Sequence, residues 1–461
     1  MKAPLSGKET MHRRRSFRSL LLVHLAALAV LAIPAPSPHA ADPLESLALR
    51  ALRDNPGLKA QRALVEASRQ GVPQARALPD PSAELELMNI AVRHPNLSDA
   101  LTTGISLGVT QALPFPGKRK LAADVAEQDV DAALARLRAS EATVAADVRE
   151  AAYQYVLQER LLDVNTATQD ALKSAAAAAL AAYGAGRGNQ ADVLLAQSME
   201  TKALADRDLL LRLLAEAKAR MEDLLAGPVE PSDLAGIELP QPPGLPPLED
   251  LLRAGDVSSP QVILSRTQVG VATAKAAQVR AEGRPDFMVG AKYRHKDMTM
   301  GGGDFVTASV GITLPFFHRK DRYGPAFQEA LLRQQSSQSE AEAVRNDVRY
   351  RITQAYQEAV HDERLAALYR DGLLPQARQA YASMLASYTA GSADFTSLLT
   401  ALTSLYNYQA DDLTARGTFH AMVAQMEGLL GQPISQAATP HLHPAVLPPH
   451  PDSTDSNGGT P

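Results

Sequence analysis

The chain repeats one plan at an offset of about two hundred residues, and this duplication limits its fold more than any other feature. The stretch 182–196 matches 387–401, and Pro56 aligns with Pro260. Across all matched stretches the offset stays between 201 and 205 residues. Because solenoid repeats are only about 20–50 residues long, we infer that a whole half-domain has been duplicated.

The duplication also divides the chain into segments. Residues 1–40 are predicted to be a signal peptide, because a basic start is followed by a short apolar core and then by prolines and small residues. The other segments are a first repeat (41–228), a proline-rich linker (229–247), a second repeat (248–433) and a tail with the composition of disorder (434–461). We therefore expect an exported protein.

Each repeat is predicted to contain short helices, then two β-strands, then a long helical hairpin. In the strands, apolar side chains alternate with small or polar ones, at 83–87 and 105–110 in the first repeat and at 287–294 and 305–314 in the second. Each run has roughly the ten residues that a tilted strand needs to cross a bilayer. The alternation predicts one apolar face and one polar face for each strand pair.

The helical parts are unusually long. No proline occurs between Pro116 and Pro228, so residues 118–183 are predicted to form one helix of about 100 Å, at about 1.5 Å per residue. The second repeat predicts the same helix over 323–388, with a bend or break near Pro375. Helices of this length indicate coiled-coil-like packing.

A Leu-Pro-Phe signature stands between strand and long helix in both repeats. Proline supplies no N–H to a strand ladder, so we expect the strands to end there and the helices to begin just beyond. The phenylalanines are expected to lie at the edge of a bilayer as an aromatic girdle. The residues of this strand-to-helix transition are Pro114, Phe115, Pro116, Gly117, Pro315, Phe316 and Phe317.

Four strands are too few to close a barrel. Their open edges would leave unpaired N–H and C=O groups in lipid, where no water can bind them. If the strands cross a membrane, several copies of the chain must therefore contribute to one shared barrel.

The duplicated plan resembles the TolC superfamily of outer-membrane efflux channels, and within it the cobalt-zinc-cadmium heavy-metal branch. The resemblance is carried by "AELELMNI" (83–90), "GISLGVTQALPFPGKRKLAADVA" (104–126), "AYGAGRGNQADVLLA" (182–196) and "LLPQARQAY" (373–381), and it covers residues 43–433. It implies a mainly α protein with a small β part, built as a homotrimer. Each protomer would give four strands to a twelve-stranded outer-membrane barrel, which continues into a helical barrel in the periplasm.

The resemblance also implies function and partners. The channel would be a passive conduit in the outer membrane of a Gram-negative bacterium, in contact with its lipid. It would join a periplasmic adaptor protein and an inner-membrane pump of the RND type, and it would export heavy-metal cations.

The glycine-rich stretch 183–188 and its partner 388–394 are predicted to be helix–turn–helix corners. The first follows an alanine-rich helix and not a strand, so a phosphate-binding loop is excluded. The resemblance makes these corners the periplasmic tip, where the pore narrows and adaptor helices dock. Its residues are Gly184, Gly186, Gly188, Asp192, Gly391, Ser392 and Asp394. For the two aspartates, helix capping is favoured over a ring that attracts cations.

Other candidate residues carry weaker signals. Glu84 and Glu86 fall on the polar strand face and would point into the lumen of a barrel, where solvation alone explains them. His441, His443 and His450 in the tail are weak candidates for binding a metal. We expect no resident metal and no cofactor.

Composition and motifs exclude several classes. Residues 41–461 carry 40 Lys and Arg against 50 Asp and Glu, which argues against a nucleic-acid partner. Cysteine is absent, so thiol chemistry and a lipid-modified N-terminal cysteine are excluded. No catalytic motif is present, and an enzyme is not expected.

Two alternatives to metal export stay open at the level of the sequence. The first keeps the architecture but changes the cargo, to drugs or to proteins in type I secretion. The second is a soluble periplasmic coiled-coil scaffold in which the apolar strands pack internally.

Overall fold

The computed structural model describes residues 42–88, 104–295 and 303–437. The predicted signal peptide lies outside the described residues, and so does the predicted tail from residue 438, with its three histidines. The described residues from Pro43 onward form one compact unit.

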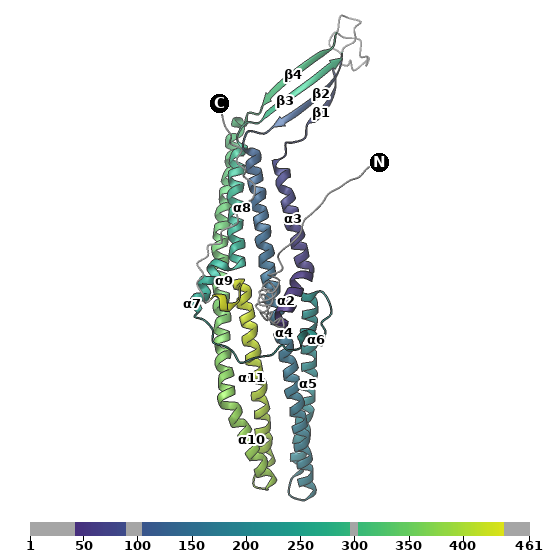
Figure 1. The fold of residues 1–461 in the computed structure, drawn as a ribbon, viewed down its shortest axis with the longest axis vertical. Coiled ribbons are helices and arrows are strands. Elements are labelled where there is room, and N and C mark those ends of the chain that lie inside the picture. The colour runs from purple at the N-terminus through teal and green to yellow at the C-terminus, as the bar shows by residue number, and fades with distance from the viewer. Residues whose placement is uncertain (1–41, 89–103, 296–302, 438–461) are drawn as a thin grey trace, which may run out of the picture. The chain divides into compact units, whose positions relative to one another are not determined.

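The elements occur in the same order in both repeats (Figure 1). The first repeat contains α2 (Pro43–Asp54), α3 (Pro56–Arg76), β1 (Ser82–Met88), β2 (Gly104–Leu113), α4 (Lys118–Gly184) and α5 (Gln190–Leu225). The second contains α7 (Leu248–Ser258), α8 (Pro260–Glu282), β3 (Phe287–His295), β4 (Phe305–Ile312), α9 (Gly324–Leu368), α10 (Leu374–Thr389) and α11 (Phe395–Leu430). The short helices α6 (Pro231–Leu234) and α12 (Ile434–Ala437) follow the first and second repeat, respectively.

The long helices agree with the prediction from proline placement. Helix α4 runs unbroken from Lys118, and Gly117 before it adopts a left-handed φ of 97°. In the second repeat the helix is interrupted as predicted: a π-helical turn, η4 (Tyr369–Leu373), separates α9 from α10. Pro375 follows directly. Because proline lacks an N–H and crowds the carbonyl four residues earlier, a wider turn at this point relieves both problems. Among the described residues, no helix has an apolar stretch long enough to span a membrane.

The four strands form one antiparallel sheet in the order β1-β2-β3-β4. The central pair, β2 and β3, joins the two repeats, with Val109 opposite Ala291. Strands β1 and β4 are the edges, and neither has a second partner strand among the described residues. One chain therefore builds an open sheet whose two edges can still accept strands.

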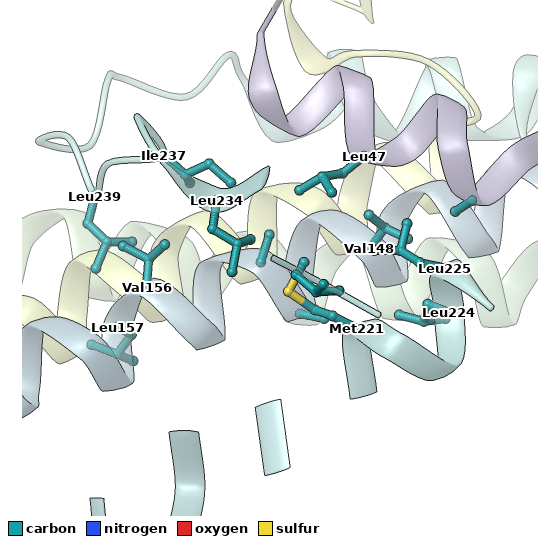
Figure 2. Packing of buried hydrophobic residues seen from close by; sticks show 14 residues of the cluster. Leu47, Val148, Val156, Leu157, Met221, Leu224, Leu225, Leu234, Ile237 and Leu239 are labelled. Carbon is teal, nitrogen blue, oxygen red and sulfur yellow. The ribbon is translucent and has the colours of Figure 1, made fainter. Parts of the chain in front are cut away.

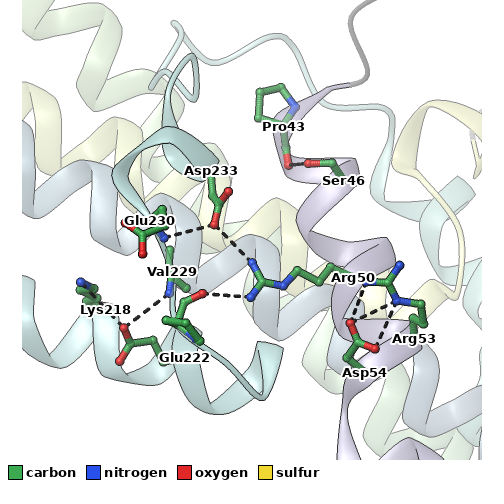
Figure 3. Close-up of polar contacts among 11 residues, drawn as sticks. Pro43, Ser46, Arg50, Arg53, Asp54, Lys218, Glu222, Val229, Glu230 and Asp233 are labelled. Atoms are coloured by element: carbon green, nitrogen blue, oxygen red, sulfur yellow. Dashed lines mark hydrogen bonds and ion pairs between the residues drawn. The ribbon is translucent and has the colours of Figure 1, made fainter.

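The linker between the repeats packs into the core (Figure 2). Leu234, Ile237 and Leu239 are each less than 8% exposed and join side chains from α2, α4 and α5. The guanidinium of Arg50 fixes the segment by bonds to Asp233 (3.2 Å) and to the carbonyl of Pro228 (2.9 Å), as Figure 3 shows. The linker thus belongs to the folded unit.

The carboxylate of Asp362 is buried in the helical part without full hydrogen bonding. Asp362 on α9 is 6% exposed, and its Oδ2 has no hydrogen-bond partner among the described residues. Burial, and then the charge of Glu358, raise the pKa of Asp362 to about 6. The folded protein therefore binds a proton at Asp362 more tightly than the unfolded chain does.

This shift predicts a dependence of stability on pH. As the pH rises from about 4 to about 6, ionisation of Asp362 should progressively lower the free energy of unfolding. Above about pH 6 this loss of stability is constant. Asp362→Asn is expected to gain about 1–2 kcal/mol at pH 7.5 and little at pH 4, because it removes the buried charge. The midpoint of thermal unfolding in detergent checks this at both pH values. Asp347→Asn, at an exposed position on the same helix, is the control.

Candidate functional site

Two helical turns lie at the end of the unit opposite the sheet (Figure 1). In the turn between α4 and α5, the amide of Arg187 donates to the carbonyl of Ala182, and the amide of Gly186 donates to the carbonyl of Tyr183, both at 2.9 Å. Gly186 has a φ of +70°. A Cβ on Gly188 would lie 3.1 Å from the amide nitrogen of Tyr183, so any side chain at this position would crowd the end of α4.

The turn between α10 and α11 repeats the same hydrogen bonds. The amide of Ser392 donates to Ser387 at 2.9 Å, and the amide of Gly391 donates to Tyr388 at 3.0 Å. Gly391 has a φ of +74°. Both turns are therefore Schellman motifs that end a helix with a left-handed glycine, and they align at an offset of 205 residues.

The predicted tip residues all lie in these two turns or just beyond them. Their capping roles differ between the repeats. Asn189 caps α5 by accepting from the amide of Asp192, which itself lies in the first turn of that helix. Asp394 caps α11 directly, with its carboxylate accepting from the amide (2.8 Å) and the hydroxyl (2.7 Å) of Ser397. These hydrogen bonds hold the pKa of Asp394 below its usual value.

The two hairpins pack against each other near their ends. Buried side chains from α4 and α5 meet Phe395, Leu399 and Leu402 of α11 in one cluster. Burial raises the pKa of Tyr388, and the charge of Asp192 on the other hairpin raises it further. Asp192 is thus close enough to Tyr388 for the two turns to influence each other electrostatically.

The first strand-to-helix transition is held by an ion pair that the sequence reasoning missed. Strand β2 ends at Leu113, and after four intervening residues α4 begins at Lys118, whose side chain is only 7% exposed. Its Nζ lies 2.8 Å from Oδ2 of Asp286, the residue before β3. The other oxygen of Asp286 accepts from the amide of Phe115 at 2.7 Å.

The phenylalanines of the two transitions lie in different environments. Phe115 stacks on Phe287 at 6.4 Å between ring centroids. Phe316 and Phe317 belong to a 3₁₀ turn, η2 (Pro315–His318), and are 60% and 71% exposed, while Pro315 is buried. The structure therefore leaves the second pair of rings open at the surface.

The sheet has an exposed apolar face. The most exposed side chains are Val310 (81%), Val306 (77%) and Leu85 (68%), and Leu107 and Val109 are also more than half exposed. The alternative in which these strands pack inside a soluble monomer is not what the structure shows. Removing this face from water requires lipid or another chain.

The polar face carries ordered rows of charge. Glu84, Gly108 and Lys292 stand side by side on β1, β2 and β3. The next row consists of Glu86, Ser106 and Arg294. Nζ of Lys292 lies 2.5 Å from Glu86 and 3.7 Å from Glu84, so one cation serves both carboxylates.

Small residues on β2 make room for this arrangement. A Cβ on Gly108 would lie 3.3 Å from Cε of Lys292, which shows that the lysine side chain lies flat across the central strand. Glu84 and Glu86 were expected on the polar face from the sequence, but the basic residues that pair with them were not. Lys292 and Arg294 share one face by their period of two, but only the register of β2 with β3 brings them to the carboxylates. Within the described ranges, no group of three or more histidine, aspartate or glutamate side chains could hold a metal ion.

The chain is similar to proteins of one family along most of its length. The sequence pattern of the family described as "Outer membrane efflux protein" matches residues 47–227 and 256–432. The cobalt-zinc-cadmium resistance protein CzcC of Cupriavidus metallidurans is 24% identical over 397 residues, which cover 84% of this chain and 90% of that protein.

Solved structures share the fold. The outer membrane protein VceC of Vibrio cholerae superposes with a TM-score of 0.70 at 18% identity, covering 85% of this chain and 96% of that one. The open state of the MtrE outer membrane channel of Neisseria gonorrhoeae gives a TM-score of 0.67 at 19% identity, with coverages of 86% and 90%. At these identities the similarity concerns the fold.

Proposed function

Because the chain belongs to the outer membrane efflux protein family, we propose that it is the outer-membrane component of a tripartite system that exports heavy-metal cations. Family membership and the TolC-like fold, mainly helical with a small antiparallel sheet, confirm the resemblance stated from the sequence. The chain is thus an outer membrane efflux channel; its cargo, its partners and its passive mechanism are the proposal.

The observation that carries the proposal is the open four-stranded sheet with an exposed apolar face. Channels of this family are trimers that work with an adaptor and an RND pump. In a homotrimer, β4 of one copy would pair with β1 of the next, and twelve strands would close a barrel without edges. The apolar face would then contact lipid, and the polar rows with Glu84 and Glu86 would face the lumen.

At the other end, we propose that the two hairpin turns form the closed periplasmic tip and the docking surface for the adaptor. The repeated Schellman motifs support this role, because they end both hairpins with the same rigid geometry. The carboxylates of the half-buried Asp192 and the exposed Asp394 would lie close together in a trimer. No step of chemistry is assigned to the chain, and energy would come from the pump.

The proposal of metal cargo rests on the similarity to the cobalt-zinc-cadmium resistance protein. Its test is a deletion strain grown on cobalt, zinc and cadmium salts, and on a panel of antibiotics. Metal sensitivity that the intact gene restores supports the proposal. Sensitivity to antibiotics alone would instead support a drug channel, and loss of a secreted protein would support type I secretion. A chain that stays soluble without detergent after fractionation would contradict the channel itself.

The tip role makes a separate prediction. Asp394→Ala removes the cap of α11 and its charge, and is expected to raise the resting conductance in planar bilayers severalfold by loosening the second hairpin. Asp394→Asn keeps a cap, as Asn189 does in the first repeat, and so separates capping from charge. If both variants conduct as the wild type does, Asp394 caps a helix and has no part in closing the pore.

A further inference from the structure

A groove lies where the sheet meets the helices of the second repeat. It encloses about 710 Å³ between the end of α8, the end of β4 and the start of α9. Most of its wall is apolar and aromatic, and its basic members come from two different segments. The apolar lining includes Val279, Ile312, Leu314, Phe316 and Phe327; the basic lining consists of Arg280, Arg284 and Arg319.

The three arginines have no carboxylate partners among the described residues. Arg280 lies 5.7 Å over the ring of Phe327, and Arg284 lies 5.5 Å over the ring of Phe115, so aromatic rings orient two of them. The acidic side chains of Glu282 and Asp286 instead face Lys118, at 3.6 and 2.8 Å. The groove therefore holds a surplus of exposed positive charge.

The groove also lies at the border of the exposed apolar surface. That surface runs along β4 through Val306 and Val310 and continues to Leu314 (48% exposed) and Phe316 (60%) at the groove. Basic and aromatic side chains at the border of an apolar band are typical of the interface between lipid tails and headgroups. A free anion would gain nothing from the apolar wall, whereas a lipid would bury its chain against it.

We propose that this groove binds an anionic phospholipid. Its phosphate would contact Arg280, Arg284 and Arg319, because guanidinium groups bind phosphate oxygens in pairs. An acyl chain would lie along Ile312, Leu314 and Phe316. This inference rests on the proposed position of the sheet in the outer membrane, and it assigns one lipid site to each copy of the chain.

The test uses the full-length protein purified in detergent, incubated with phosphatidylglycerol or phosphatidylcholine and analysed by native mass spectrometry. The wild type is expected to retain phosphatidylglycerol in preference to phosphatidylcholine. The triple variant Arg280→Gln, Arg284→Gln and Arg319→Gln should lose that preference by roughly tenfold to a hundredfold, since each basic residue near a lipid surface contributes to binding. The control is Lys275→Gln on α8 with Arg333→Gln on α9, both outside the groove.

Several outcomes would overturn the proposal. One is that the triple variant retains phosphatidylglycerol as well as the control does. Another is that inorganic phosphate at equal concentration displaces the lipid completely, because the groove would then be a site for free anions. If the triple variant loses its trimer and the control does not, the groove is an interface between copies. Circular dichroism checks folding, and an Arg-to-Lys triple variant should keep part of the preference. Lipid retention is measured on purified protein. A negative result would therefore contradict the lipid site alone, while the growth and fractionation experiments above test the proposed function.

Discussion

Asp286→Ala is expected to destabilise the protein by about 2–3 kcal/mol, somewhat less than the about 3–5 kcal/mol for breaking a fully buried ion pair, because Asp286 itself keeps 34% of its side chain exposed. Among the described residues, the substitution leaves the buried ammonium of Lys118 with Glu282 alone as a partner, through its carbonyl at 3.4 Å and its carboxylate at 3.6 Å. It also removes the acceptor of the Phe115 amide. The measurement is the midpoint of thermal unfolding in detergent.

The position of Asp286 explains why one side chain has so large an effect. Its side chain holds the transition from β2 to α4, while its backbone exchanges hydrogen bonds with Thr313 at the end of β4, at 2.7 and 2.8 Å. Both strand-to-helix transitions are therefore fixed at one residue. Loss of its side chain should loosen the first transition and leave the second in place.

Two variants separate charge from hydrogen bonding. Asp286→Asn keeps an acceptor for the amide of Phe115 but loses the negative charge. It should therefore destabilise the protein less than Asp286→Ala does. Adding Lys118→Met to it removes the unpaired cation and should recover part of the loss, since apolar replacement of a buried pair is often neutral. Asp321→Ala, at an exposed position nearby, is the control. Equal stability of Asp286→Ala and this control would refute the role.

The regular parts of the fold could be predicted from the sequence because they depend on local patterns. The absence of proline between Pro116 and Pro228 fixed the continuity of α4, and Pro375 marked the interruption before α10. Alternation with a period of two found all four strands. The glycine turns at Gly186 and Gly391 could also be located, because a left-handed C-terminal residue is a local requirement.

The ion pairs and the packing of the linker could not be predicted from the sequence, because they depend on contacts between distant parts of the chain. Asp286 lies 168 residues from Lys118, and Lys292 lies 206 residues from Glu86. Neither pair follows from the offset of the duplication, since β2 of the first repeat pairs with β3 of the second in a register that no local pattern encodes. The linker, read from its prolines as a simple connection, likewise gained its place in the core only from the packing of Leu234, Ile237 and Leu239.

Lys292→Gln is expected to make the channel more selective for cations. Each copy carries Glu84 and Glu86 against Lys292 and Arg294 on the polar face, so the rows are balanced in charge. Without Lys292, a trimer would present six carboxylates against three arginines in its lumen, and rings of carboxylates favour cations. Under a tenfold KCl gradient, the reversal potential should move by at least about 10 mV toward the ~59 mV of a perfectly cation-selective pore.

Matched variants identify the origin of that shift. Lys292→Arg keeps the charge and should behave as the wild type does, while Lys292→Gln combined with Glu86→Gln should return the potential toward its original value, because the freed carboxylate is removed with its partner. Lys275→Gln on α8 controls for the loss of a lysine elsewhere in the chain. A reversal potential that is the same in Lys292→Gln and wild type would place the polar face of the sheet outside the ion path. The charge balance across β1, β2 and β3 would then serve only to hold the strands in register.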